Sequence, residues 1–456
     1  QLNNNTNVRF ILMTNRTSLS NIDVITLDEK GTIHKNVTLV VENGIITEIG
    51  NSENDQFAST AVDCTNKVAM PGLVNSHCHS PMNMVRGWAE DLPFVEWLEA
   101  IWIAESGITP DDVYWAAALA AAEMIRSGTV AYNDKYFYMH RVADAVQESG
   151  LKAALTWTVF GMGEDTEVGS GLDETIDWIK ELDETSKGKI KTYIGPHSPY
   201  LCPDDFLRKT VELAHELGKG IHLHVAETKE QVDQSIARYN LSPVQHLDKL
   251  GVFDLPDVTI AAHTLHVDDK DIEILVNKNV IVPHCPITYM KLAMPFPSIQ
   301  KCVDAGVQIS LGTDGPGSNA DMDMFAVIRQ TALIHKYQTV DPAMVSGDTA
   351  LRMATQAGAK AVGMSDHGML KVGAPADLIL IDMNAPHLRP VHNIVANIVH
   401  CVKGSDVCDV MVNGNWLMRN RELKTLDEEK ILYETEKRAH KIVDRGKKQL
   451  RQYARD

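Results

Sequence analysis

The chain has 456 residues, which is enough for one large domain and a smaller one. Its 61 acidic residues against 43 Lys and Arg give a formal net charge of −18, which argues against nucleic acid as a partner because phosphate binding requires a basic surface. Charged residues at 23% and hydrophobic residues at 44% are typical of a globular enzyme.

The cysteines and the apolar segments indicate the cellular compartment of the protein. Seven cysteines occur singly, without a CxxC pair, which predicts reduced thiols. The first twenty residues lack the apolar segment of a secretory signal, and no stretch approaches the roughly 20 apolar residues of a membrane span. We therefore expect a soluble cytoplasmic protein with no membrane partner.

The first predicted elements are strands. Segments rich in β-branched residues predict strands at residues 21–27, 37–41 and 45–49, with an Asn43-Gly44 turn before the last. We assign residues 1–70 to the N-terminal part of a small β-domain.

The middle of the chain alternates short apolar segments with longer segments of helical apolar spacing, such as residues 113–126 and 204–217. Eight strand–helix units predict an α/β fold with a closed parallel (β/α)8 barrel of the TIM type over residues 71–367. An open doubly wound sheet is the weaker alternative. The predicted strands are 68–77, 129–134, 153–159, 190–196, 220–227, 258–263, 280–283 and 307–314.

Strands are expected again near the C-terminus, at residues 376–382 and 410–416. A chain that begins and ends in strands can pair them, so we expect residues 1–70 and 368–424 to form one β-sandwich. The charged, glycine-poor stretch from 426 to 453 predicts a C-terminal helix within residues 425–456.

Polar residues gather at the predicted carboxyl ends of the barrel strands, where barrels of this class carry their chemistry. The fifth predicted strand holds both His222 and His224 and ends at Glu227. The others are His77 and His79 on the first strand, His197 on the fourth, His263 on the sixth and Asp314 on the eighth.

The spacing of His77 and His79 suits metal binding, because side chains two apart on a strand face the same way. His222 and His224 repeat this spacing, so one member of that pair is enough. Asp314 can supply an oxygen ligand; its alternative role is that of a turn aspartate beside Gly315. Together these residue types at several strand ends predict a metal site.

Several longer segments resemble a known superfamily. Residues 70–79 (MPGLVNSHCH), the HLHVAE segment ending at 227, residues 261–263 and residues 312–315 resemble the amidohydrolases, in the branch that holds cytosine deaminase, guanine deaminase, the triazine hydrolases and the adenosine-type deaminases. Residues 79–87, 89–92, 96–98, 195–202 and 318–324 are similar to the 5-methylthioadenosine/S-adenosylhomocysteine deaminase family. The likeness runs from about residue 24 to 416.

The resemblance implies a set of metal ligands, namely His77, His79, His224 and Asp314. Two-metal members of the superfamily carry a lysine at the end of the fourth strand, and residues 193–197 have none. We therefore expect one divalent ion, Zn²⁺ or alternatively Fe²⁺.

The resemblance also implies catalytic roles. Asp314 and His263 would deprotonate and orient the attacking water, which adds to the ring carbon that bears an exocyclic amine. Glu227 would protonate the adjacent ring nitrogen, and return of a proton through Asp314 or Glu227 would then expel ammonia. The alternative role of Glu227 is that of a carboxylate at a helix N-terminus.

Three further residues match positions that contact the nucleoside in that family: Trp97, Glu105 and His197. Trp97 and Glu105 lie in a helix-like stretch, where core packing and a solvent-facing carboxylate are the alternatives. The expected activity is metal-dependent deamination of an adenosine-type nucleoside. The alternative is hydrolysis of guanine, cytosine or an s-triazine, including dechlorination.

The sequence departs from the family at three places. No arginine occurs in residues 155–163 or 169–172, so a homocysteine carboxylate lacks its expected cation and S-adenosylhomocysteine is expected to be a poor substrate. Thr288 and Tyr289 replace a usual Ser-Asn pair, and Lys135 has no assigned role.

The family likeness also favours a homo-oligomer. A metal-free scaffold is disfavoured because all four ligands are present, and the unrelated zinc deaminases are disfavoured because no PCxxC motif occurs.

Overall fold

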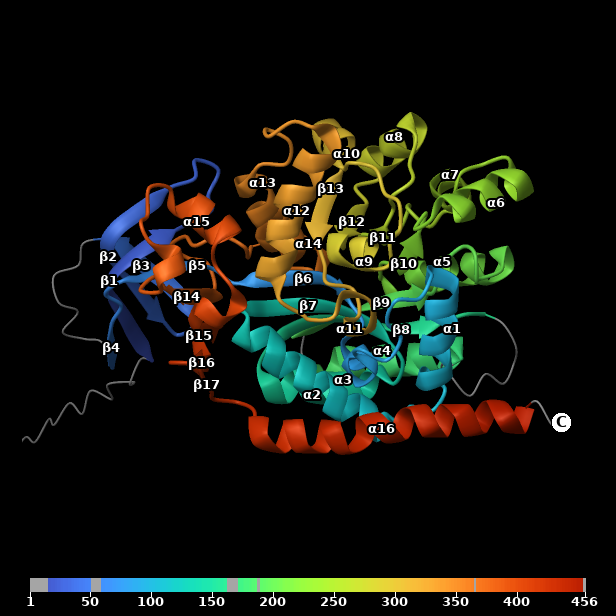
Figure 1. Cartoon of the computed structure of the whole chain (residues 1–456), viewed down its shortest axis with the longest axis horizontal. Coiled ribbons are helices and arrows are strands. Elements are labelled where there is room, and N and C mark those ends of the chain that lie inside the picture. The colour runs from blue at the N-terminus through green and yellow to red at the C-terminus, as the bar shows by residue number, and fades with distance from the viewer. Residues whose placement is uncertain (1–14, 51–58, 162–170, 187–188, 365, 454–456) are drawn as a thin grey trace, which may run out of the picture.

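The computed structural model describes residues 15–50, 59–161, 171–186, 189–364 and 366–453. Figure 1 shows a strand-rich part that combines strands from near both ends of the chain, beside a larger part in which strands and helices alternate. The long helix α16 (Glu428–Tyr453) runs along one side of the larger part. Within the described residues, no helix is both long enough and apolar enough to cross a bilayer.

The strand-rich part is one nine-stranded sheet in the order β17-β16-β15-β14-β5-β1-β2-β3, with β4 paired to β1. Strand β5 pairs antiparallel with β14, so strands from the two ends of the chain share this sheet. It surrounds a hydrophobic core of its own, which includes Leu19, Leu39, Leu378 and Met411. Its strands are β1 (Arg16–Ile25), β2 (Ile33–Glu42), β3 (Ile45–Gly50), β4 (Thr60–Asp63), β5 (Lys67–Pro71), β14 (Leu378–Asp382), β15 (Val407–Val412), β16 (Asn415–Arg419) and β17 (Glu422–Leu423).

Two predicted strands are each divided in the structure. The segment 68–77 ends its first strand at Pro71 and begins a second at Leu73, because Gly72 packs so closely on Val130 that a Cβ would lie 2.2 Å from its side chain. The segment 410–416 is a hairpin between β15 and β16, since Asn413 and Gly414 adopt φ of 48° and 76°. The Asn43-Gly44 turn was expected and has the same geometry.

The larger part contains eight parallel strands in two four-stranded sheets, β6-β7-β8-β9 and β10-β11-β12-β13. Isolated parallel bridges join the sheets at both edges, Ile194 to Ile221 and Cys78 to Asp314. One buried cluster takes a side chain from six of these strands, including Val74 and Tyr193. The strands are β6 (Leu73–Cys78), β7 (Thr129–Tyr136), β8 (Lys152–Val159), β9 (Ile190–Pro196), β10 (His222–Val225), β11 (Ile260–His263), β12 (Ile281–His284) and β13 (Gln308–Leu311).

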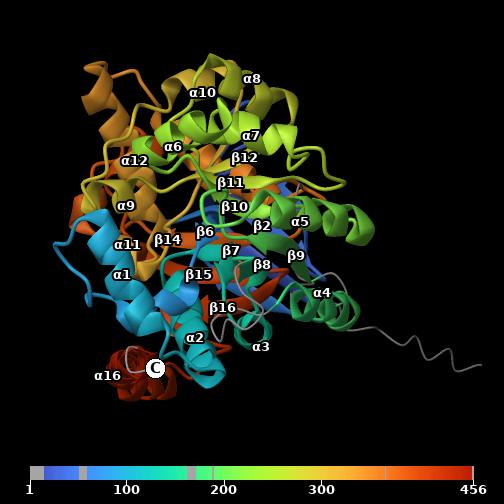
Figure 2. The same cartoon turned by 90° about the vertical axis from the view of Figure 1, so that its right-hand side faces the viewer.

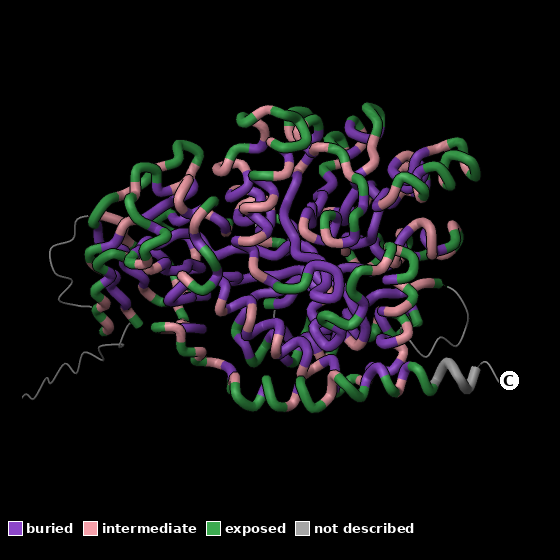
Figure 3. Tube along the Cα trace, in the orientation of Figure 1, coloured by how far each residue is buried: buried purple, intermediate pink, exposed green. Residues whose placement is uncertain are grey.

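Helices surround these strands, as the end-on view in Figure 2 shows. The strands form the buried interior and the outer helix faces are exposed (Figure 3). The helices between or after the strands are α1 (Phe94–Glu105), α2 (Pro110–Arg126), α3 (Met139–Ser149), α4 (Leu172–Ser186), α5 (Asp204–Leu217), α6 (Lys229–Tyr239), α7 (Pro243–Lys249), α8 (Asp269–Asn277), α9 (Pro286–Lys291), α10 (Gln300–Ala305), α11 (Pro316–Asn319), α12 (Met324–Thr339), α13 (Gly347–Arg352), α14 (Gly358–Ala361) and α15 (Ile394–His400). Short 3-10 turns at Ser80–Val85, Pro386–Leu388 and Gly404–Asp406 and a π turn at Met353–Ala357 complete the fold.

A buried ion pair ties the two parts together. Lys152, the first residue of β8, lies 2.5 Å from Asp377, which precedes β14 and also contacts His367. Asp377→Asn leaves the Lys152 charge buried without a carboxylate, so we expect it to lower the free energy of unfolding by about 3 kcal/mol in chemical denaturation. Lys301→Met breaks an exposed pair with Asp269 and should leave that free energy nearly unchanged. Equal losses of unfolding free energy in the two variants would contradict a stabilising role for the Lys152–Asp377 ion pair.

Candidate active site

The candidate site lies at the carboxyl ends of the parallel strands. His77 and His79 stand at the end of β6, His224 lies in β10, and Asp314 follows β13. The Asp314 amide donates a hydrogen bond to the His77 carbonyl, 3.0 Å away, so backbone pairing sets the aspartate beside the first histidine. Asp314 and His263 both adopt left-handed φ, 65° and 71°, and such conformations are held mainly at functional sites.

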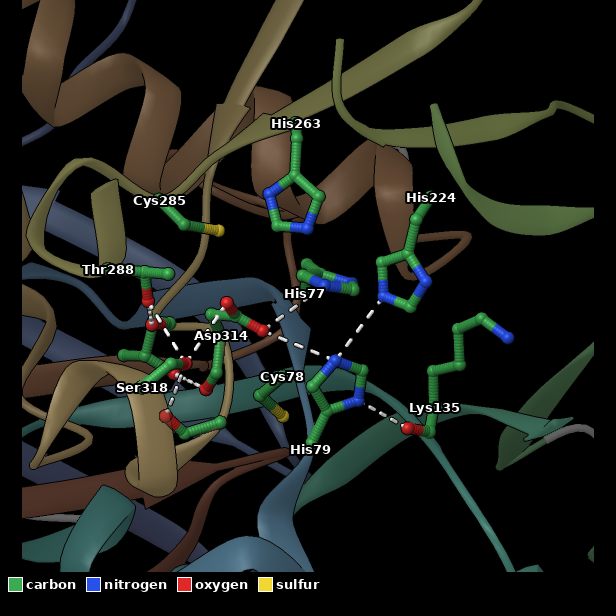
Figure 4. Close-up of polar contacts among 12 residues, drawn as sticks. His77, Cys78, His79, Lys135, His224, His263, Cys285, Thr288, Asp314 and Ser318 are labelled. Carbon is green, nitrogen blue, oxygen red and sulfur yellow. Dashed lines mark hydrogen bonds and ion pairs between the residues drawn. The ribbon is translucent and has the colours of Figure 1, made fainter. Parts of the chain in front are cut away.

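The donor atoms of these side chains converge, as Figure 4 shows. The Nε2 atom of His79 lies 3.2 Å from Asp314 Oδ1 and 3.4 Å from His224 Nε2. The Nε2 atom of His77 lies 3.6 Å from the same carboxylate oxygen. Two overlapping groups of three could hold a metal ion, with each group's ligand atoms within 4.8 Å of one another: His77, His79 and His224, and His77, His263 and Asp314.

Hydrogen bonds fix the orientation of the three imidazoles. The Nδ1 atom of His79 lies 2.5 Å from the Lys135 carbonyl, and that of His224 lies 3.1 Å from the His197 carbonyl. Because a carbonyl only accepts, both Nδ1 atoms donate, which leaves the Nε2 lone pairs facing the group. His77 Nδ1 lies 2.9 Å from His222 Nε2, and its own Nε2 is buried without a hydrogen-bond partner. This donor set, with its unpartnered nitrogen, fits a divalent ion.

Burial and neighbouring charges set the protonation of these groups. Burial lowers the pKa of His77 to about 3 and holds that of His224 well below its ordinary value, so both rings are neutral, as ligands must be. Burial alone would raise the pKa of Asp314, but the neighbouring His77 and His79 imidazoles hold it well below its usual range. The aspartate is therefore a carboxylate.

Glu227 and His263 form a second pair beside the ligand group. His263 Nε2 lies 3.7 Å from Glu227 Oε1. Tyr200 donates its hydroxyl proton to Glu227 Oε2 at 3.2 Å, and the Tyr289 hydroxyl lies 3.1 Å from His263 Nδ1. Burial raises the pKa of Glu227, which favours a carboxyl group able to donate a proton.

A pocket opens over these groups, with a cavity volume of about 90 Å³. All three residues predicted to bind substrate line it: Trp97, Glu105 and His197. Trp97 donates its indole N–H to the Gly317 carbonyl at 3.3 Å. Glu105 is buried, accepts a hydrogen bond from the Tyr136 hydroxyl at 2.6 Å, and has its pKa raised to about 7 by burial. The alternative of a solvent-facing Glu105 is wrong.

The structure also places the residues that the sequence left without a role. Tyr289 supports His263 and accepts a hydrogen bond from the Cys285 amide. Thr288 lies 3.2 Å from Ser318, whose hydroxyl donates to Asp314 Oδ2. Lys135 lines the pocket with its side chain fully buried. Residues 162–170, part of the region predicted to lack an arginine, lie outside the described residues.

Comparisons with known proteins extend these observations. Residues 68–417 match the amidohydrolase family. The 5-methylthioadenosine/S-adenosylhomocysteine deaminase of Pelotomaculum thermopropionicum is 42% identical over 92% of this chain and 98% of its own length. The 5′-deoxyadenosine deaminase of Methanosarcina mazei is 42% identical over 94% of this chain and 98% of its own. A crystal structure of an adenosine deaminase from Xanthomonas campestris, with bound zinc, aligns with a TM-score of 0.88 at 30% identity, covering 94% of this chain and 98% of that one.

Proposed function

Because the chain belongs to the amidohydrolase family, we propose that it is a metal-dependent aminohydrolase that removes the amine of an adenosine-type nucleoside as ammonia. The observation that carries this proposal is the meeting of the His77, His79 and Asp314 donor atoms beside Glu227 and His263, at a pocket that all of these residues except His77 line. Relatives that are 42% identical over nearly their whole length and are named as deaminases of adenosine-type nucleosides support it.

We assign one divalent ion to this site, held by His77, His79, His224 and Asp314. Imidazole and carboxylate donors suit Zn²⁺ best, with Fe²⁺ as the alternative, and zinc is bound in the Xanthomonas campestris adenosine deaminase. When bound, such an ion makes a nucleophilic water available at neutral pH. The unpartnered, buried Nε2 of His77 supports a cation at this point.

The remaining side chains would move the protons. Asp314 is a carboxylate and can accept a proton from the attacking water, while His263, at the end of β11, orients that water. Glu227, with its raised pKa, can protonate the ring nitrogen next to the carbon under attack, so charge does not build up on the heterocycle. Tyr200 and Tyr289 position Glu227 and His263 for these steps.

The pocket walls suit a nucleoside. Trp97 supplies an aromatic surface, and the buried Glu105 can accept hydrogen bonds from ribose hydroxyls once a ligand competes with Tyr136. His197 stacks on Phe160, with ring centroids 5.0 Å apart, and faces the same pocket. We assign these three residues to substrate binding.

We further propose that the eight parallel strands form one closed (β/α)8 barrel over residues 71–367. Residues 1–70 and 368–424 would form the β-sandwich domain, followed by the C-terminal helix in 425–456. The bridges at both edges of the two parallel sheets and the separate core of the nine-stranded sheet support this division.

The seven free cysteines favour a reducing, cytoplasmic setting, and the family likeness favours a homo-oligomer.

The proposal is tested by ammonia release from one panel: adenosine, 5′-methylthioadenosine, S-adenosylhomocysteine, guanine, cytosine and an aminotriazine. We expect fast release from the first two and slow release from S-adenosylhomocysteine, whose carboxylate lacks an arginine partner in the expected segments. Turnover of a free base or of the triazine, with none of the nucleosides, would keep the site and overturn the substrate assignment.

A further inference from the structure

Lys135 is a buried lysine in the wall of the pocket, and the proposed chemistry does not use its side chain. It is the penultimate residue of β7, and its side chain has no exposed surface. Figure 4 shows the side chain running past His79 and His224, with the terminal nitrogen on the side of these rings away from Asp314. Lys135 therefore does not belong to the ligand group.

The contacts of the Lys135 terminal nitrogen leave it incompletely satisfied. It donates to the Thr158 hydroxyl at 3.2 Å and to the Gly195 carbonyl at 3.3 Å. An ammonium carries three N–H bonds, and neither acceptor is charged. No carboxylate among the residues that the structure describes forms an ion pair with Lys135. The charged form of this buried amine is costly without an anion, so a third acceptor supplied by a ligand would stabilise it.

The position of Lys135 defines which part of a substrate it can contact. Thr158 and Gly195 lie at the ends of β8 and β9, and Gly195 is two residues before His197. Lys135 and His197 thus form one wall of the pocket. Glu227 follows β10, which is separated from β7 by β8 and β9, so Lys135 and Glu227 approach the pocket from different strands.

We propose that Lys135 is a specificity-determining residue, which donates a hydrogen bond to a second ring nitrogen of the substrate, distinct from the nitrogen that Glu227 protonates. This inference rests on the proposed function and deepens it. In an adenosine-type nucleoside the remaining ring acceptors are N3 and N7. The enzyme would therefore select amino-heterocycles that carry a second ring nitrogen with an in-plane lone pair.

The test pairs a protein change with a substrate change. Lys135→Met removes the donor and keeps a long unbranched side chain. Adenosine, 3-deazaadenosine and 7-deazaadenosine are each measured with wild type and variant, as kcat/KM and as equilibrium binding. We expect Lys135→Met to lower kcat/KM for adenosine roughly 10- to 100-fold, the range of a hydrogen bond to a charged group. With one of the two deaza substrates the same change should have almost no effect, because the acceptor is already missing.

Controls separate this role from a structural one. Lys191→Met removes a partly exposed lysine of β9 that pairs with Asp257 at 2.7 Å, and it should leave all three substrates unaffected. The zinc content and thermal midpoint of each variant are measured in parallel. If Lys135→Met does not fold, Lys135→Gln, which keeps a shorter hydrogen-bond donor, replaces it. Equal losses on all three substrates would overturn the inference and leave the proposed function standing. A wild-type protein inert towards these three nucleosides and towards 5′-methylthioadenosine would overturn both.

Discussion

Replacing Glu227 with glutamine is expected to slow ammonia release from the best nucleoside substrate by roughly 10³-fold, within the usual range for loss of a general acid or base. Glutamine has nearly the same shape but cannot deliver a proton to the ring nitrogen. Glu227 is buried, its pKa is raised by that burial, and Tyr200 and His263 hold it beside the ligand group. The loss should fall on kcat, measured at saturating substrate with ammonia as the product detected.

The matched control is Glu230→Gln, an exposed glutamate three residues further along, in the first turn of α6. Its activity should equal that of the wild type. Metal content should be unchanged in both variants, because Glu227 is not among the assigned ligands. If Glu227→Gln retained wild-type kcat, the carboxyl would be a helix-terminal charge and another group would protonate the ring.

The order of strands and helices could be predicted from the sequence because apolar residues recur with a different spacing in each. Eight short apolar segments in the middle of the chain correspond to eight parallel strands. The errors occurred where one apolar run crosses two elements. The division at Gly72 depends on its close approach to Val130, and a contact between residues that distant in the chain has no local signal.

The site was partly predictable because residues at strand ends could be recognised as a group. The structure brings the Nε2 atoms of His77 and His79 within 3.6 Å of Asp314 Oδ1. Which histidine of the fifth strand faces the group could not be read from spacing alone: His224 does, while His222 lies behind His77 and fixes its ring.

The supporting residues left no pattern in the sequence. Tyr200 and Tyr289 are single tyrosines in loop or short-helix segments, and their hydroxyls matter only because folding brings them to Glu227 and His263. The carbonyls of Lys135 and His197 orient two imidazoles, and a backbone carbonyl carries no sequence signal at all. Such contacts decide ring orientation, so the geometry of a metal centre depends on more than its ligands.

Removal of the metal with a chelator is expected to lower ammonia release by more than roughly 10³-fold, since an ion of this kind supplies several kcal/mol of transition-state stabilisation. Activity should return on addition of one equivalent of Zn²⁺ per chain, measured by titration against the metal-free protein. Fe²⁺ in place of Zn²⁺ tests the alternative metal. His77→Gln should bind zinc more weakly in the same titration, because it removes the nitrogen that is buried without another partner.

The stability of the metal-free protein provides a second measurement that does not depend on turnover. Without the ion, the Nε2 atom of neutral His77 stays buried without a hydrogen-bond partner, so the thermal midpoint should fall and should rise again with zinc. His222→Gln should lower zinc affinity less than His77→Gln, because it loosens the ligand ring without deleting it. Full activity in a protein shown to be free of metal, or two ions bound per chain at saturation, would contradict the one-ion site.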